Sequence, residues 1–217
     1  MLASGRGSNL QALLDALGPA DAPGRIAVVI SNRADAGALE RARAARIPAA
    51  VTRGDGQDAD GLLALLREHG AELVVLAGWL KQVPGSVVAA YRDRMLNVHP
   101  ALLPAFGGPG MYGHRVHEAV LASGARLTGV TVHLVDEQYD HGTIIAQWPV
   151  PVRPGDTADT LAARVLAVEH WLLPAAVRAA CTQIAADARV RPLCGAADAF
   201  ALATNHEPSH SHALVPA

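Results

Sequence analysis

An asparagine and a histidine, two residues apart in Leu96-Asn97-Val98-His99-Pro100, are the first side chains that could do chemistry. The apolar run around them predicts a buried strand, and alternation along a strand places Asn97 and His99 on the same side. Open α/β sheets bind their ligands at the carboxyl ends of strands. There an amide and an imidazole could together stabilise one developing oxyanion. The same sequence pattern also fits a histidine without a catalytic role, whose ring only hydrogen-bonds to a backbone carbonyl.

An acidic segment, residues 136–142, lies between two predicted strands and reads Asp-Glu-Gln-Tyr-Asp-His-Gly. Most acidic turns are simply solvated. A carboxylate in this turn could instead pair with His99 and keep its imidazolium charged. The spacing in the sequence leaves both interpretations open.

Residues 4–9, Ser-Gly-Arg-Gly-Ser-Asn, are followed by leucines at 10, 13, 14 and 17, which form one apolar face of a helix. Glycines let the backbone approach a ligand closely, and the free N–H groups at a helix start suit a phosphate. Ser8 or Asn9 could cap the helix or donate to a phosphate oxygen. An ordinary strand-to-helix turn that binds no ligand would have a similar sequence. The segment lacks the third glycine of the dinucleotide-binding fingerprint.

Short β-branched runs alternate with helical segments, which predicts an α/β fold: an open, mostly parallel sheet with an antiparallel edge and helices on both faces. The expected strands are residues 25–31, 73–77, 95–98, 127–135 and 143–152, the last two antiparallel, with prolines marking the sheet edge. The expected helices are residues 36–45, 85–93, 113–123 and 157–183, the last broken or kinked near Pro174. Only residues 1–3 precede the glycine-rich turn, so either the first strand is very short or several residues are missing from the start of the sequence.

The composition is that of a folded chain: of 217 residues, 51% are hydrophobic and 18% charged, with a formal net charge of −2. This argues against disorder and against nucleic acid as the main partner. Cys181 and Cys194 form neither a metal-ligand spacing nor a disulfide framework. No stretch approaches the roughly 20 apolar residues that span a bilayer, and the start has no signal-peptide pattern. We therefore expect a cytoplasmic protein without a membrane partner.

Two regions are expected along the chain. Residues 1–186 should form the catalytic domain, and residues 187–217 a C-terminal extension that is partly flexible. The histidines of the extension are expected to be solvated and not to bind a metal.

Taken together, the motifs resemble the glycinamide ribonucleotide formyltransferases of purine biosynthesis. The similarity covers residues 3–174. It rests on Gly-Arg-Gly-Ser-Asn-Leu-Gln (5–11), Ser-Asn-Arg-Ala-Asp-Ala (31–36), Leu-Ala-Gly-Trp-Leu-Lys (76–81), Leu-Asn-Val-His-Pro-Ala-Leu-Leu-Pro (96–104), Gly-Met-Tyr-Gly (110–113) and residues 131–142. The shared order and spacing of these segments make coincidence implausible.

The resemblance implies a formyltransferase-type fold. It also implies that the protein transfers a formyl group to the amine of glycinamide ribonucleotide. The formyl group would come from 10-formyltetrahydrofolate as the co-substrate, and no metal would be needed. It implies that Asn97, His99 and Asp140 are catalytic and that His133 supports them. The phosphate is expected at Gly7, Ser8 and Asn9, and the sugar at Glu169. The folate pocket is expected at Trp79, Leu80, Lys81, Gln82, Val83, Glu137, Gln138, Tyr139 and Asp140. Lys81 stands where some members carry arginine, which keeps the charge but loses the planar fork. A homodimer is compatible with this resemblance.

The corresponding mechanism is direct attack of the neutral amine on the formyl carbon. Asn97 and a protonated His99 would stabilise the oxyanion, while Asp140 would hold His99 charged and help to move the proton. Three alternatives remain: a methionyl-tRNA formyltransferase, expected to carry a further C-terminal domain; a formyltetrahydrofolate hydrolase, expected to carry an N-terminal regulatory domain; and a non-catalytic folate- or nucleotide-binding module. The Gly-Ser-Asn loop favours a nucleotide acceptor over water.

Overall fold

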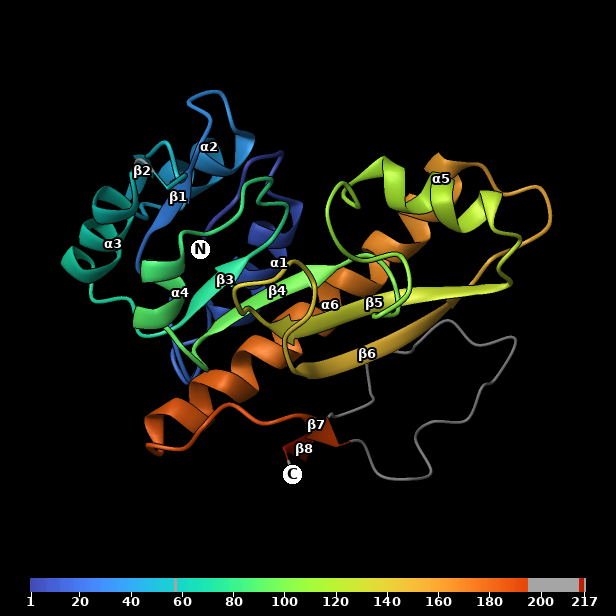
Figure 1. Ribbon diagram of the computed structural model, residues 1–217. Coiled ribbons are helices and arrows are strands. Elements are labelled where there is room, and N and C mark those ends of the chain that lie inside the picture. Colours follow the sequence, from blue (N-terminus) through green and yellow to red (C-terminus); the bar gives the residue numbers. More distant parts are fainter. Residues whose placement is uncertain (57, 195–214, 217) are drawn as a thin grey trace.

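A computed structural model describes residues 1–56, 58–194 and 215–216 of the chain (Figure 1). In one half of the sheet, β1 (Val29–Ser31) pairs in parallel with β2 (Ala49–Val51). In the other half, β3 (Val74–Leu76) pairs in parallel with β4 (Met95–His99). β5 (Leu127–Leu134) is antiparallel to β4, and β6 (Ile144–Pro151) is antiparallel to β5 at the edge. The predicted mostly parallel sheet with an antiparallel edge is confirmed.

The first strand is reduced to a single residue that joins the two halves of the sheet. Leu2 forms parallel bridges to Ile30 of β1 and to Leu76 of β3. Its N–H donates to the carbonyl of Val75 at 2.8 Å, and the N–H of Ala3 donates to the carbonyl of Ile30 at 3.0 Å. In this chain the first strand is therefore very short. The glycine-rich turn follows this bridge directly, so the bridge fixes where the turn lies.

Successive side chains of the inner strands point to two hydrophobic cores, one on each face of the sheet. Val29 and Val75 belong to the core that contains residues of α1 (Ser8–Leu17), α2 (Gly37–Ala44) and α6 (Ala158–Ala185). Their chain neighbours Ile30, Val74 and Leu76 belong to the core that contains residues of α3 (Ala59–Glu68) and α4 (Gly85–Ala90). Both faces of the sheet are therefore covered by helices, as predicted.

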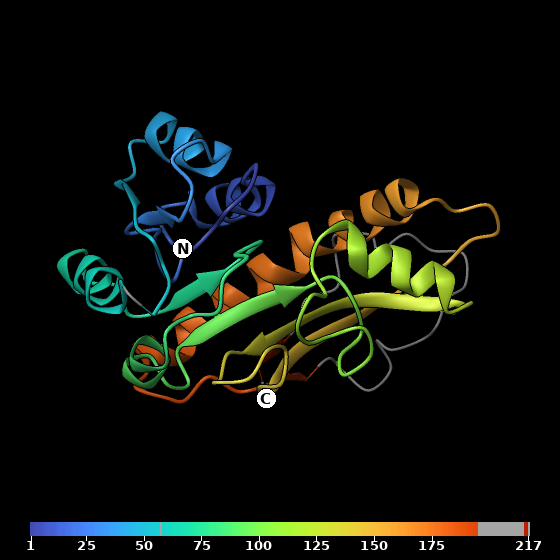
Figure 2. The same cartoon turned by 45° about the horizontal axis from the view of Figure 1, so that its top comes forward.

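The long helix α6 is continuous over 28 residues, so the predicted break near Pro174 is wrong. It begins with a capping box in which Thr157 and Thr160 exchange side-chain and backbone hydrogen bonds. By length and composition alone, α6 could cross a membrane, contrary to our expectation that no stretch comes close. Half of its most apolar window is buried inside the protein, which is also what a core helix shows. In both ribbon views α5 (His114–Ala122) lies beside the first half of α6 (Figures 1 and 2).

Residues 46–72 contain two elements that sequence analysis did not predict. β2 reads Ala-Ala-Val and is half-buried to exposed, so it has no apolar run to signal a strand. α3 buries Leu62 and Leu66, whose spacing of four is a helical signal that could have been used. At the C-terminal end, β7 (Leu193–Cys194) pairs with β8 (Val215–Pro216). The rest of the expected flexible extension, residues 195–214 and 217, lies outside the described residues.

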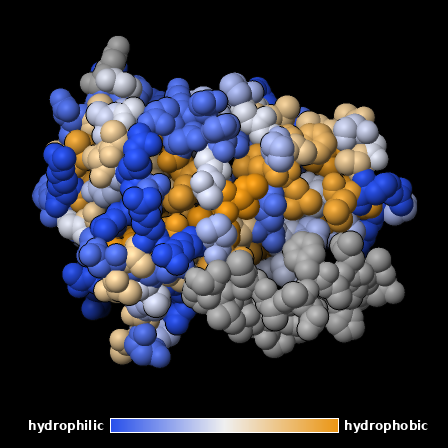
Figure 3. All heavy atoms as spheres, turned by 60° about the horizontal axis from the view of Figure 1, so that its bottom comes forward, coloured by the Kyte–Doolittle hydropathy of each residue, from blue (hydrophilic) through white to orange (hydrophobic). Residues whose placement is uncertain are grey.

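Apolar side chains also reach the surface. On the face shown in Figure 3 they form a band across the middle of the molecule. Elsewhere, three of the large apolar residues that are exposed, Leu80, Tyr112 and Tyr139, lie around one cavity. Exposed apolar groups that gather around a cavity are typical of a ligand-binding site.

Candidate active site

A cavity of about 500 Å³ opens at the carboxyl ends of β3 and β4. Its walls come from the glycine-rich turn before α1, the loops after β3, β4 and β5, and one face each of α5 and α6. The predicted site residues that line it are Gly7, Ser8, Asn9, Trp79, Leu80, Lys81, Gln82, Val83, Asn97, His99, His133, Gln138, Tyr139, Asp140 and Glu169. Only Glu137, of the residues predicted for the site, does not line it.

Asp140 is the centre of the polar cluster in this cavity. Its Oδ2 lies 3.5 Å from Nδ1 of His99 and accepts a hydrogen bond from the N–H of Gly108 at 2.9 Å. Its Oδ1 lies 3.5 Å from Nδ2 of Asn97 and 3.6 Å from Nε2 of His133. The structure therefore brings the predicted trio together, with His133 as a fourth member.

The environment of Asp140 keeps it ionised. Burial alone would raise the pKa of Asp140, but the contact with His133, the attraction of His99 and the Gly108 N–H outweigh this effect, so the pKa lies below its ordinary value. The backbone at Asp140 has a φ of 52°, which is uncommon for a residue with a side chain. Such conformations gather at functional sites.

His99 is buried, and each of its ring nitrogens faces an oxygen. Nε2 lies 2.8 Å from the carbonyl oxygen of Phe106, which can only accept, so Nε2 carries the hydrogen. The other nitrogen, Nδ1, faces Asp140 and is the one that can take up a proton. Burial lowers the pKa of His99, and the charge of Asp140 offsets this only in part. We expected Asp140 to hold His99 charged; its carboxylate favours the charged ring but does not outweigh burial.

His133 fixes the orientation of the Asn97 side chain. The two residues face each other across the β4–β5 ladder. Nδ1 of His133 lies 2.8 Å from the carbonyl of Leu134 and donates to it, so in the neutral ring Nε2 accepts from the Asn97 amide nitrogen at 3.0 Å. One amide hydrogen of Asn97 is thereby engaged. The second makes only the long contact with Asp140 and is the one available to a ligand.

The glycine-rich turn ends at Gly7, which is the N-cap of α1 with a φ of 79°. No side-chain hydrogen bond caps the helix, so the idea that Ser8 or Asn9 caps it is wrong. A Cβ on Gly7 would lie 2.7 Å from Cα of Ala38, so only glycine fits at this position. The first N–H groups of a helix have no partner within the helix. Here they meet the cavity and suit an anion.

Asn9 and Glu169 form a buried pair in the wall beside this turn. Nδ2 of Asn9 donates to Oε2 of Glu169 at 2.6 Å, which ties α1 to α6. Burial raises the pKa of Glu169 to about 7, against the opposing effect of the Asn9 hydrogen bond. Oδ1 of Asn9 is buried without a hydrogen-bond partner among the described residues. A ligand that brings a hydrogen-bond donor would satisfy this oxygen.

The two segments predicted to wall the folate pocket contact each other. Nε2 of Gln82 donates to the backbone carbonyl of Glu137 at 3.0 Å. The carboxylate of Glu137 pairs with Arg92 at 2.6 Å. The side chain of Glu137 is therefore engaged away from the cavity, and its role as a side-chain ligand is not supported.

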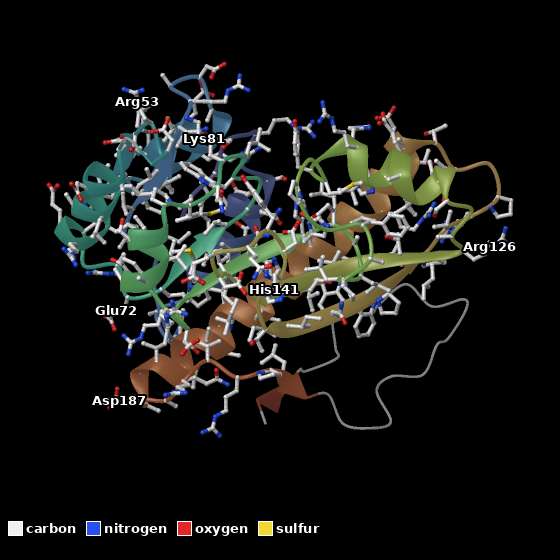
Figure 4. The ribbon with its side chains drawn as sticks, in the orientation of Figure 1. Arg53, Glu72, Lys81, Arg126, His141 and Asp187 are labelled. Atoms are coloured by element: carbon white, nitrogen blue, oxygen red, sulfur yellow. The ribbon has the colours of Figure 1, made fainter. Side chains whose placement is uncertain are left out.

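Two other predicted folate-pocket residues, Trp79 and Lys81, are held in place by contacts outside the cavity. Trp79 is buried in the core shared with α3 and α4. The ammonium of Lys81 donates to the carbonyl of Arg53 at 2.8 Å and to Asp55 at 3.1 Å, and Lys81 and Arg53 lie near one another in Figure 4. The charge of Lys81 is therefore paired with Asp55.

Three parts of the site were not predicted from the sequence: the carbonyl of Phe106, the N–H of Gly108 and the side chain of His117. The first two are backbone groups, which residue type does not reveal. His117 lines the cavity from α5 and is buried. Its spacing of three from His114, which also lines the cavity, was a helical signal in the sequence.

Comparison with known proteins agrees with this geometry. The profile of the family described as formyl transferase matches residues 1–177. A chloroplastic phosphoribosylglycinamide formyltransferase of Arabidopsis thaliana is 44% identical over 186 residues, which cover 83% of this chain and 64% of that protein. The chain thus spans less than two thirds of the length of this relative.

Two solved structures are similar to this one. A phosphoribosylglycinamide formyltransferase from Anaplasma phagocytophilum has a TM-score of 0.77 and 37% identity, covering 91% of this chain and 88% of its own. A formyltetrahydrofolate deformylase from Pseudomonas syringae has a TM-score of 0.73 and 28% identity, covering 83% of this chain and 60% of its own. The family resemblance of the motifs is confirmed, and the chain belongs to the formyl transferase family.

Proposed function

We propose that the protein transfers the formyl group of 10-formyltetrahydrofolate to the amine of glycinamide ribonucleotide. The observation that carries the proposal is the convergence of Asn97, His99 and His133 on Asp140 in the same cavity as the open start of α1. The cluster of Asn97, His99, His133 and Asp140 suits acyl transfer, and the start of α1 suits a phosphorylated acceptor. The names of the most similar relatives support both halves of this assignment.

In this proposal the ribonucleotide lies along α1 and α6. The phosphate accepts hydrogen bonds from the first N–H groups of α1, at Gly7, Ser8 and Asn9. A sugar hydroxyl donates to Glu169 or to the unpaired Oδ1 of Asn9, which is the kind of partner that these buried oxygens need. The pterin and the formyl group of the folate take the other wall, at residues 79–83 and 138–140.

The reaction balances without a covalent enzyme intermediate. The neutral amine attacks the formyl carbon, the bond between that carbon and the folate nitrogen breaks, and the amine proton passes to the leaving nitrogen. The second amide hydrogen of Asn97 points to where the oxyanion develops. Nδ1 of His99 takes up the proton that the amine loses and returns it to the leaving folate nitrogen; while it is an imidazolium, the ring adds a second donor for the oxyanion.

The state of His99 suits a group that gains and returns a proton. Burial lowers its pKa, so the ring is neutral before the reaction, and the Asp140 carboxylate stabilises the imidazolium once it has formed. Because Nε2 is held by the Phe106 carbonyl, the ring exchanges its proton at Nδ1 alone. His133 keeps the Asn97 amide turned toward Asp140 and acts as a positioning residue.

A deformylase that transfers the formyl group to water is the second candidate, because the Pseudomonas syringae deformylase has a similar fold. The anion-binding start of α1 and the Asn9–Glu169 pair favour a nucleotide acceptor over water. A catalytic domain at residues 1–186, a cytoplasmic location and a homodimer stay predictions. Neither nucleic acid nor a membrane has a role in the proposed reaction.

The test is an absorbance assay of 10-formyltetrahydrofolate with and without glycinamide ribonucleotide. We expect loss of the formyl-folate only when the ribonucleotide is present. Loss without the ribonucleotide would assign the deformylase activity instead. Binding of the folate with no turnover under either condition would mean a binding module.

A further inference from the structure

His117 is a buried polar side chain that the proposed mechanism leaves without a role. It lies in the first half of α5, is 5% exposed and lines the same cavity as Asn97 and His99. Its Nδ1 is buried and has no hydrogen-bond partner among the described residues. Buried polar groups of native proteins nearly always have a partner. The missing partner of His117 therefore points to a group that enters the cavity.

The surrounding helices hold the ring of His117 in place. Val116 and Val120 are fully buried and anchor α5. One turn before His117, Nε2 of His114 lies 3.1 Å from a carboxylate oxygen of Asp159 in the first turn of α6. The rings of His114 and His117 meet edge to face, with 6.4 Å between their centroids. A ring that is fixed in this way can recognise a ligand at little entropic cost.

The electrostatic surroundings of His117 favour an uncharged ligand group. Burial, together with the smaller effects of the nearby His114 and His99, lowers its pKa to about 4. The ring is therefore neutral near pH 7 and offers one hydrogen-bond donor and one acceptor. A neutral imidazole has no charge with which to attract a phosphate. It can exchange hydrogen bonds with an amide or a hydroxyl group of a ligand.

The position of His117 indicates which part of the ribonucleotide it meets. The cavity face of α6 runs from Ala162 through Leu166 to Glu169, and Glu169 is joined to the phosphate-binding turn by Asn9. α5 is joined to the first turn of α6, at Asp159, which precedes Ala162. His117 thus stands away from the phosphate and close enough to His99 for their charges to interact. The part of the acceptor that carries the reacting amine must lie there.

We propose that His117 hydrogen-bonds the uncharged amide of the acceptor beside its reacting amine and thereby helps to select the glycinamide group. This inference rests on the proposed function. His117 acts here as a specificity-determining contact and takes no part in the transfer of protons.

Two variants separate this contact from a role in packing. His117→Leu removes both nitrogens and keeps an apolar side chain, while His117→Asn keeps a polar group near the position of Nδ1. For His117→Leu we expect the KM for the ribonucleotide and its Kd, measured by calorimetry without folate, to rise roughly tenfold, the size of one lost hydrogen bond. The KM for the folate should stay unchanged. His117→Asn should recover part of the loss.

Thermal unfolding provides the readout that a packing role would change. Removing a buried polar atom without a partner does not destabilise a protein, so His117→Leu should unfold at the wild-type temperature or above it. A lower unfolding temperature with an unchanged Kd for the ribonucleotide would overturn the proposal, as would equal losses for both substrates. If the wild-type protein itself shows no ribonucleotide-dependent deformylation, the proposed function fails first, before any variant is compared.

Discussion

At the scale of single residues, Asn97 shows how the site divides one side chain between two tasks. One amide hydrogen is used by His133 at 3.0 Å, and the other makes a contact of 3.5 Å with Asp140 that a ligand can replace. Loss of one oxyanion donor costs about 10²–10³ in turnover. We predict that Asn97→Ala loses kcat on that order, in an assay with both substrates saturating. A folded Asn97→Ala variant with a kcat close to that of the wild type would show that Asn97 has no role in the mechanism.

Asp140 is expected to control the charge of His99. Its carboxylate works against burial and raises the pKa of His99. Asp140→Asn should therefore lower the pKa of His99 below its wild-type value, as followed by NMR titration of the ring, and reduce kcat by about 10²-fold or more. Asp136→Asn is the matched control, because the carboxylate of Asp136 binds the exposed His141 instead. A pKa of His99 that is the same in Asp140→Asn and wild type would contradict the assigned role.

Glu169 is expected to make stability depend on pH. Burial raises its pKa from 4.5 to about 7, so the folded state prefers the protonated form. The contribution of protonated Glu169 to the free energy of unfolding is fully present below pH 4.5 and is lost as the pH rises through about 7. Relative to Glu169→Gln, which stays neutral, the wild type should lose about 1–3 kcal/mol of unfolding free energy between pH 5 and pH 8. Urea unfolding of both proteins at the two pH values tests this, and a constant difference between them would show that Glu169 ionises normally.

At the scale of elements, the turn before α1 depends on a single glycine. Gly7 has a positive φ, and an added Cβ would meet the backbone of Ala38. Gly7→Ala should cost about 1–3 kcal/mol of stability and raise the KM for the ribonucleotide. Gly5→Ala in the same turn is the control, because an added Cβ there meets nothing within 4 Å. Equal unfolding midpoints for the two variants would show that the backbone conformation at Gly7 is not required.

Elements with a strong local signal could be predicted from the sequence. The apolar runs that become β3 and β4 were found because buried strands of a parallel sheet are continuously apolar. β2 was missed because its three small residues lie at an exposed edge and carry no pattern. Pro174 led us to expect a break or a kink in α6, since a proline usually ends or kinks a helix; the break is wrong, because α6 continues past it.

At the scale of the whole molecule, the sequence predicted which residues belong to the site but not how they act together. Asn97 and His99 could be placed side by side because one strand carries both. The distance from His99 to Asp140 depends on the loop after β5, and the tie between Asn9 and Glu169 spans 160 positions. Burial lowers the pKa of His99, and burial is a property of the assembled fold that no local motif reports.

The central claim is that the formyl group passes to the ribonucleotide amine and not to water. The most direct measurement follows 10-formyltetrahydrofolate labelled with ¹³C in its formyl carbon, incubated with the protein and glycinamide ribonucleotide, by mass spectrometry and NMR. We predict that the label appears in a formylated ribonucleotide, with one equivalent of tetrahydrofolate released. Label found in free formate, whether or not the ribonucleotide is present, would contradict the account.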